Sequence, residues 1–259
     1  MKYIDSHCHI DSILKKCKIT TFNNLKLQHY SEQFEACITV SCDPWSIENT
    51  LRQLENPEIY GAFGIHPHEA KYYDDNLEKK IIDTMNHVKT LAWGEIGLDF
   101  HYNLTEQDIQ KDVFKRQILA AIKVNKPIII HSRKAETDTL DIVNHYIPEN
   151  WKVHLHCYTS STEMALQLLE KFPNLYIGFT GAITFNNTAE IQETVNKIPL
   201  DRLLLETDGP YMAPVPYRGK PCHSGYIPLI AEKISEIKAI PLDQVYDQIR
   251  VNTRAMYGI

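Results

Sequence analysis

The sequence predicts an α/β fold, a single (β/α)8 TIM barrel spanning residues 1–259, and three observations support this prediction. Short apolar runs alternate with amphipathic stretches along the whole chain. Several runs are continuous and β-branched, as in Ile128-Ile129-Ile130, which suits strands buried on both faces of a parallel sheet. Eight such runs, most followed by a helical pattern, favour a closed barrel over a doubly wound open sheet.

The elements follow one another in a regular order. The predicted strands are Tyr3–Ser6, Ala36–Val40, Ile59–Gly64, Leu91–Glu95, Pro127–Ile130, Lys152–Leu155, Leu175–Phe179 and Leu203–Leu205. The predicted helices are Pro44–Leu54, Thr105–Val124, Ser160–Phe172, Asn187–Lys197 and two in Ile227–Ile259, split near Pro241. Asp43 is a good N-cap with Pro44 at the first helical position, and Thr105 with Asp108 resembles a capping box. Without a flexible linker or internal repeat, one domain is expected.

Composition limits the class of protein and its location. The 43% hydrophobic and 23% charged fractions are those of an ordinary globular protein. No apolar run approaches the roughly 20 residues that span a bilayer, and the N-terminus lacks a secretion signal, so a cytoplasmic protein without membrane contact is expected. Six scattered cysteines without a C-x-x-C pair are expected to be reduced and mostly buried. A net charge of −6 argues against a protein that coats nucleic acid by electrostatics alone.

Histidines and acids follow the ends of the predicted strands. His7 and His9 end the first strand, and residues two apart in extended backbone point to the same face. The other residues of this kind are Glu95, His131, His156 and Asp208. In a barrel these side chains converge on the mouth where barrel enzymes place their active sites. Five strand ends that each supply a ligand-type residue favour one metal site over unrelated surface residues.

Imidazole nitrogen and carboxylate oxygen suit zinc, manganese or a similar ion, and the absence of a cysteine set excludes a structural thiolate site. Two other histidines, His145 and His154, fall outside the set. His154 shares the strand parity of His156 but comes two residues earlier, so we expect it deeper in the barrel or below the mouth.

Six short segments also form a recognisable series. They are Asp5–His9, Gly64–His68, Gly94–Asp99, His131–Arg133, His156–Tyr158 and Glu206–Tyr211. In order and spacing this series resembles the TatD family of metal-dependent deoxyribonucleases, part of the amidohydrolase superfamily. The resemblance implies a (β/α)8 barrel that hydrolyses phosphodiesters in DNA as a 3'-5' exonuclease, acting on single strands or ends.

The resemblance also implies roles for individual residues. One divalent ion (Zn, Mn, Mg or similar) is expected at His7, His9, Glu95 and Asp208. A second is expected at Glu95, His131 and His156, so that Glu95 bridges the two. His66 matches a position that contacts the scissile phosphate. Glu206 matches an acid that helps to hold a third ion or a catalytic water.

The chemistry of such a site is consistent with these roles. Two ions about 3.5–4 Å apart lower the pKa of a shared water and clamp phosphate oxygens. Asp208 is placed to accept the proton of that water, so Asp208, Glu95 and Glu206 are the expected catalytic residues. The predicted phosphate-binding residues are His66, Arg133, Arg218 and Lys220, and His68 either orients its turn or touches substrate. The aromatic candidates for stacking on bases are Phe100, Tyr158, Tyr211 and Tyr217.

Two alternatives stay open. The first is an amide, ester or small phosphoester hydrolase of the same superfamily, since a fold and a metal site do not define a substrate. The second is a non-catalytic binding protein, which the complete ligand set argues against. Two segments depart from the family pattern, Tyr158–Ser160 and Arg218–Gly225, and both border the mouth, so they bear on substrate preference. No feature indicates an obligate protein partner.

Overall fold

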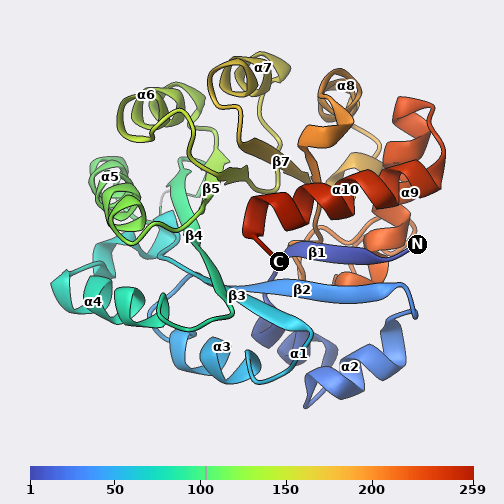
Figure 1. Ribbon diagram of the computed structural model, residues 1–259, viewed down its shortest axis with the longest axis horizontal. Helices are drawn as coiled ribbons and strands as arrows, with labels where there is room; N and C mark the ends of the chain where they lie inside the picture. Colours follow the sequence, from blue (N-terminus) through green and yellow to red (C-terminus); the bar gives the residue numbers. More distant parts are fainter. Residues whose placement is uncertain (103) are drawn as a thin grey trace.

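The protein, described for residues 1–102 and 104–259 by a computed structural model, is a (β/α)8 barrel (Figure 1). Eight parallel strands neighbour one another in chain order, from β1 to β8. A parallel bridge between Cys8 and Gly209 joins the last strand segment to the first. The predicted fold class is therefore confirmed.

Each strand alternates with at least one helix around the barrel. The strands are β1 (Tyr3–Cys8), β2 (Phe34–Ser41), β3 (Ile59–Phe63), β4 (Thr90–Asp99), β5 (Ile128–Arg133), β6 (Val153–Leu155), β7 (Leu175–Phe179) and β8 (Leu203–Leu205). The α-helices are α1 (Ile10–Cys17), α2 (Phe22–His29), α3 (Ile47–Gln53), α4 (Asp75–Thr84), α5 (Gln107–Lys123), α6 (Glu136–Tyr146), α7 (Thr162–Lys171), α8 (Ala189–Lys197), α9 (Ile227–Lys238) and α10 (Leu242–Tyr257). The 3-10 helices are η1 (Pro67–Tyr72), η2 (Gly181–Thr184), η3 (Leu200–Arg202) and η4 (Ser224–Tyr226).

Four helices start two or three residues later than predicted, and the cause is clear for two of them. Helix α3 begins only at Ile47, because the Asp43 carboxylate accepts from the backbone N–H groups of Trp45 and Ser46, both at 2.8 Å, and forms a turn before the helix. Helix α5 begins at Gln107, since the Thr105 hydroxyl donates to the carbonyl of His68 (2.7 Å) instead of capping the helix. In both cases a side chain with capping chemistry stabilises a loop at the mouth.

Strand β4 is longer than predicted and contains an irregularity. Trp93 pairs with Ile128, but Ile96 pairs with Ile130, so Gly94 and Glu95 together face one residue of β5. Such a bulge bends the strand and re-aims a side chain, and the pairing resumes up to Asp99. A Gly-Glu pair interrupts the apolar run, which is why the sequence pattern ends four residues early. A similar shift lies between Asp5 and Cys8 of β1.

Apolar side chains fill the space between the barrel and its helices, and a smaller cluster lies inside the barrel. The inner cluster includes Ile129 and Leu204 from the strands, with Met256 and Tyr257 from α10 packed against them. Figure 1 shows α10 lying across one end of the barrel. Polar ligand-type side chains occupy the other end. Among residues 1–102 and 104–259, no helix has both the length and the apolar character that crossing a bilayer requires.

Candidate metal centre

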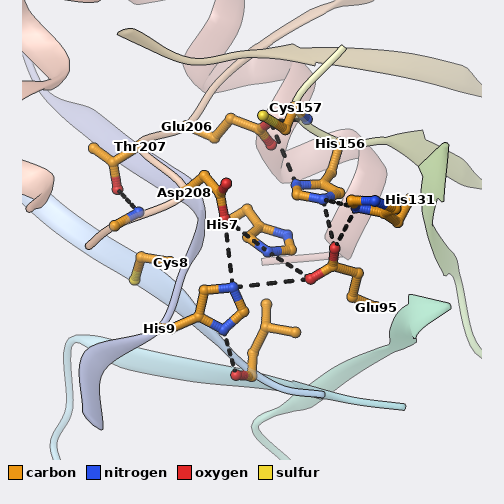
Figure 2. A network of polar contacts seen from close by, with 12 residues as sticks. His7, Cys8, His9, Glu95, His131, His156, Cys157, Glu206, Thr207 and Asp208 are labelled. Carbon is orange, nitrogen blue, oxygen red and sulfur yellow. Dashed lines mark hydrogen bonds and ion pairs between the residues drawn. The ribbon is translucent and has the colours of Figure 1, made fainter. Parts of the chain in front are cut away.

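The carboxylate of Glu95 lies at the centre of the site, and its two oxygens face different histidines (Figure 2). Oε2 lies 3.4 Å from Nε2 of His7 and 3.8 Å from Nε2 of His9. Oε1 lies 2.8 Å from Nδ1 of His131 and 2.7 Å from Nε2 of His156. The bulge at Gly94 and Glu95 turns this side chain into the mouth, so one carboxylate faces two pairs of imidazoles.

Asp208 completes the side of the site that faces Oε2. Its Oδ1 lies 3.4 Å from Nε2 of His9 and 3.9 Å from Nε2 of His7. Asp208 adopts a left-handed backbone conformation (φ 53°), which aspartate tolerates better than most residues. Its N–H donates to the carbonyl of His7 (2.9 Å), and the N–H of His9 donates to the carbonyl of Gly209 (2.8 Å). The ends of β1 and β8 thus hold one another in register.

His66 joins the side that faces Oε1. Its Nε2 lies 3.5 Å from Oε1 of Glu95, while its Nδ1 accepts from the backbone N–H of His68 (3.1 Å). The ring therefore points its second nitrogen into the site. His131 and His156 lie 3.2 Å apart, Nδ1 to Nε2, on the same oxygen.

The residues fit divalent ions by their donor chemistry and by one unpaired group. Sets of ligand atoms within 4.8 Å of one another include His7, His9 and Glu95 on one side and Glu95, His131 and His156 on the other. The Nε2 atom of His7 is buried without a hydrogen-bond partner among the described residues, a costly arrangement that a bound cation would relieve. Neutral imidazoles and carboxylates are the ligands that first-row ions take in catalytic sites.

The local charges favour ionised carboxylates. Burial opposes the charged form of Glu95, but the surrounding histidines, His156 foremost, hold the pKa of its carboxyl well below the usual range. Burial also opposes the charge of Asp208, and a hydrogen bond from His9 followed by the charge of His156 lowers its pKa. Burial lowers the pKa of His7, and the charge of His156 lowers it further. Two negative carboxylates and a neutral His7 favour cation binding. Despite burial, the nearby carboxylates raise the pKa values of His9, His131 and His156, so a bound cation would displace protons from these rings.

Asp99 orients one ligand from outside. Its Oδ2 lies 3.2 Å from Nε2 of His131 and 3.0 Å from Nε2 of His68. A carboxylate on the far nitrogen of a histidine selects the tautomer and ring orientation of a metal ligand. Gln110 of α5 holds Asp99 in turn, accepting from its N–H (2.8 Å) and donating to its carbonyl (3.1 Å). His9 is oriented similarly, with Nδ1 3.0 Å from the carbonyl of Val40.

Asp5 holds the loop that carries Asp208. Its Oδ1 accepts from the N–H of Thr207 (2.9 Å), and its Oδ2 accepts from the hydroxyls of Thr207 (2.6 Å) and Ser224 (2.7 Å). Asp5 is fully buried. Removing this carboxylate would leave several buried donors without partners, so Asp5 supports the site through the backbone that it holds.

Glu206 lies below the ligands and is fully buried. Its Oε1 accepts from the N–H of Cys157 and lies 3.8 Å from Nδ1 of His156. Cys157 has a left-handed backbone conformation (φ 45°) that this contact helps to hold. Burial raises the pKa of Glu206 to about 7, although the charges of His156 and His7 act in the opposite direction.

The structure sorts the predicted substrate-binding residues into two groups. His66, His68 and Arg133 line a cavity of about 450 Å³ above the ligands. In the described part of the chain, Arg218 and Lys220 are exposed and do not line that cavity. The Arg218 guanidinium lies 4.3 Å from the ring centre of Phe185, and Nζ of Lys220 lies 5.5 Å from that of Tyr217.

Of the four aromatic residues predicted to stack on bases, one lines the cavity and the other three pack against the protein. Tyr211 lines the cavity and is exposed. Tyr158 is buried and donates to the carbonyl of Ser161 (2.6 Å), which is a packing role. Phe100 packs against the core, and Tyr217 stacks on Tyr226 at 4.6 Å.

Three residues that hold the site were given no role from sequence: Asp5, Asp99 and His154. Asp99 shares strand parity with Glu95, so extending the strand past the Gly-Glu pair would have placed it in the mouth. His154 lies below the mouth as expected, fully buried, with Nε2 2.8 Å from Oε2 of Glu206. No local pattern identifies Asp5, since its partners lie in the segment after β8.

The barrel and its cluster of histidines and carboxylates define a metal-dependent hydrolase. The chain belongs to the family described as TatD related DNase, whose model matches residues 4–258. It is 34% identical to the human 3'-5' RNA nuclease TATDN2, over 99% of this chain and 35% of that protein. The chain thus spans about a third of the human protein.

Other relatives match end to end. The chain is 34% identical to the uncharacterized metal-dependent hydrolase YabD of Bacillus subtilis, over 98% of both chains. The crystal structure of YJJV, a TatD homologue from Escherichia coli, superposes with a TM-score of 0.90 at 23% identity, over 99% of this chain and 98% of that one. This likeness shows the shared fold.

Proposed function

We propose that this protein is a nuclease that hydrolyses phosphodiester bonds in DNA with two divalent ions, as a 3'-5' exonuclease on single strands or strand ends. The proposal rests on the position of the Glu95 carboxylate. One of its oxygens faces His7 and His9, and the other faces His131 and His156. When bound there, two ions would supply an activated water and neutralise phosphate oxygens. The family description supports DNA as the substrate.

Side chains of the protein would set the spacing of the ions, accept a proton and bind the phosphate. Glu95, shared by both halves, sets the spacing of the ligands. Asp208, at the mouth beside His9, accepts the proton of the attacking water as a general base. Arg133 lines the cavity and can grip a phosphate oxygen through its guanidinium. His66 supplies a second donor close to Glu95.

Glu206 contributes as a buried acid. With Oε1 3.8 Å from His156 and the set His7, His156 and Glu206 within ligand range of one another, it orients His156 or holds a third ion. Its depth below the mouth favours the orienting role. We also propose a reducing, cytoplasmic location, because all six cysteines are free thiols.

RNA is the second candidate substrate, and the name of the 34% identical human relative, a 3'-5' RNA nuclease, favours it. A parallel assay separates the candidates. Single-stranded DNA, single-stranded RNA, duplex DNA, an aminoacyl ester and a small phosphodiester are each incubated with metal-loaded protein and with a chelator. We expect chelator-sensitive release of mononucleotides from the 3' end of DNA. Turnover of the ester alone would overturn the nuclease assignment.

A further inference from the structure

In the part of the chain that the structure describes, four tyrosine and tryptophan side chains are exposed, and all of them lie at one end of the barrel. Among the described residues, the exposed tyrosines and tryptophans are Trp45 (67%), Tyr72 (46%), Tyr102 (61%) and Tyr211 (56%). Each belongs to a segment that follows a strand, after β2, β3, β4 and β8 respectively. The carboxyl ends of parallel barrel strands share one face, so all four surround the mouth of the metal centre. We call these four residues the aromatic rim.

The rim borders the cavity directly. Tyr102 and Tyr211 line it, and Trp45 lies between Asp43 and Ser46, which also line it. Trp45 is presented by a fixed turn, because the Asp43 carboxylate accepts from its N–H (2.8 Å). Tyr72 meets Trp45 edge to face, with ring centres 5.3 Å apart. These large side chains are held in place and still keep about half or more of their surface exposed, from 46% for Tyr72 to 67% for Trp45.

Two rim residues stand beside the residues of the centre itself. The ring centre of Tyr211 lies 6.4 Å from that of His9, on the side of the site that faces Oε2 of Glu95. The ring centre of Tyr102 lies 5.6 Å from that of His68, whose Nε2 contacts Asp99 behind His131. A nucleic acid strand with one phosphate bound at the metal centre would therefore run past Tyr211 on the Oε2 side of Glu95 and past Tyr102 on the Oε1 side.

Charge accounts for phosphate binding at the metal centre but not for binding of the rest of a strand across this mouth. The cavity lining contains the acids Asp11, Asp43 and Glu69 besides the carboxylates of the centre. Away from bound ions these groups repel phosphate. Among the described residues, Arg133 is the only lysine or arginine of that lining, and Lys71 has Nζ 5.3 Å from the ring centre of Tyr72. Beyond the phosphate bound by the ions and Arg133, the polymer must gain affinity from contacts that tolerate an acidic surface, and base stacking on aromatic rings is such a contact.

We propose that the aromatic rim is a stacking subsite for the unpaired bases of a nucleic acid strand whose phosphate lies in the cavity, with Trp45 and Tyr72 as its outer part. This inference rests on the proposed nuclease function. Bases in a duplex are already stacked on each other, so the rim selects single strands and frayed ends. Because every base has an aromatic face, the rim is expected to bind with little sequence preference.

Tryptophan fluorescence tests the inference without relying on turnover. Trp45 is exposed, whereas Trp93 is fully buried and Trp151 is only partly accessible. The Zn-loaded protein, made slow to cleave by Asp208→Asn, is titrated with a short single-stranded DNA and with an abasic strand of the same length. We expect the normal strand to quench the emission and to bind more tightly than the abasic strand. Because Trp45→Ala removes this reporter, the affinity of this variant is measured by the fluorescence anisotropy of a dye-labelled strand, and we expect it to be about 5- to 150-fold weaker.

Val88→Ala serves as the matched control, since Val88 is 89% exposed but precedes β4 at the opposite end of the barrel. It should bind both strands as the parent does. If normal and abasic strands bind with equal affinity, and Trp45→Ala does not change it, the stacking subsite is wrong but the nuclease proposal is unaffected. Binding of neither strand would overturn both.

Discussion

Nε2 of His154 lies 2.8 Å from Oε2 of Glu206, and both side chains are fully buried beneath the metal centre. Nδ1 of the same ring lies 2.6 Å from the hydroxyl of Tyr257, the last residue of α10. A polar chain therefore runs from the helix across the barrel end to an acid below the ligands. Gly178 of β7 leaves room for it, because a Cβ there would lie 2.3 Å from Oε2 of Glu206.

Tyr257→Phe tests this chain by removing one hydroxyl. The change leaves Nδ1 of His154 buried without its partner, so we expect the free energy of unfolding to fall by about 1–3 kcal/mol. Urea denaturation measures this change. Tyr176→Phe is the control, because among the described residues the Tyr176 hydroxyl makes no hydrogen bond, and its effect should stay within about 0.5 kcal/mol. Equal effects of the two substitutions would show that the buried contact contributes nothing.

Asp208→Asn tests the proposed general base. Asparagine keeps the size of the side chain but accepts a proton poorly, so turnover should fall by about 100- to 10,000-fold. Metal content, measured by elemental analysis, should persist through His7, His9 and the second half of the site. Near-normal turnover with metal still bound would contradict the assignment.

Arg133→Ala tests phosphate binding inside the cavity. Loss of a charge-assisted hydrogen bond should raise KM for an oligonucleotide about 10- to 150-fold, with a smaller effect on kcat. Arg218→Ala and Lys220→Ala should have smaller effects, because neither residue lines the cavity within the described structure. A larger increase in KM for Arg218→Ala than for Arg133→Ala would instead support the phosphate-binding role that the sequence predicts for Arg218.

The pH dependence of stability tests the environment of His223. Burial, followed by the charge of His29, lowers the pKa of His223 from 6.5 to about 4, and its ring packs on Tyr226 at 4.1 Å and faces Tyr30 at 5.9 Å. The unfolded chain binds the proton more tightly between these pH values. Stability is therefore complete above pH 6.5 and falls by about 3 kcal/mol as the pH approaches 4.

His223→Phe keeps the aromatic contact and removes the titrating group. Urea unfolding of the parent and the variant at pH 7 and pH 5 should show a smaller loss in the variant. Parallel losses would mean that another group determines the acid sensitivity.

The sequence predicted much of this molecule because barrel strands produce a strong local pattern. Short apolar runs, several of them β-branched, located all eight strands, and ligand-type residues at their ends marked the mouth. The failures have physical causes. The bulge at Glu95 interrupts the apolar pattern, so the continuation of β4 to Asp99 was not predicted. Asp43 and Thr105 have side chains that can cap helices, but in the structure they form hydrogen bonds within loops.

Long-range contacts could not be predicted at all. Asp5 meets Thr207, and His154 meets Tyr257, across 202 and 103 residues of chain, and no local periodicity encodes these pairs. The exposure of Trp45 and the burial of Tyr158 also depend on tertiary packing. Both are aromatic residues in loops at the same mouth, and only the fold separates a packing role from an open face.

The positions of the two Glu95 oxygens predict that two ions share this carboxylate. Crystals soaked with Mn²⁺ and measured by anomalous scattering test it most directly. We predict two peaks about 3.5–4 Å apart, one among Oε2 of Glu95, His7 and His9, and the other among Oε1 of Glu95, His131 and His156. A single peak, or peaks that do not both contact Glu95, would contradict the account.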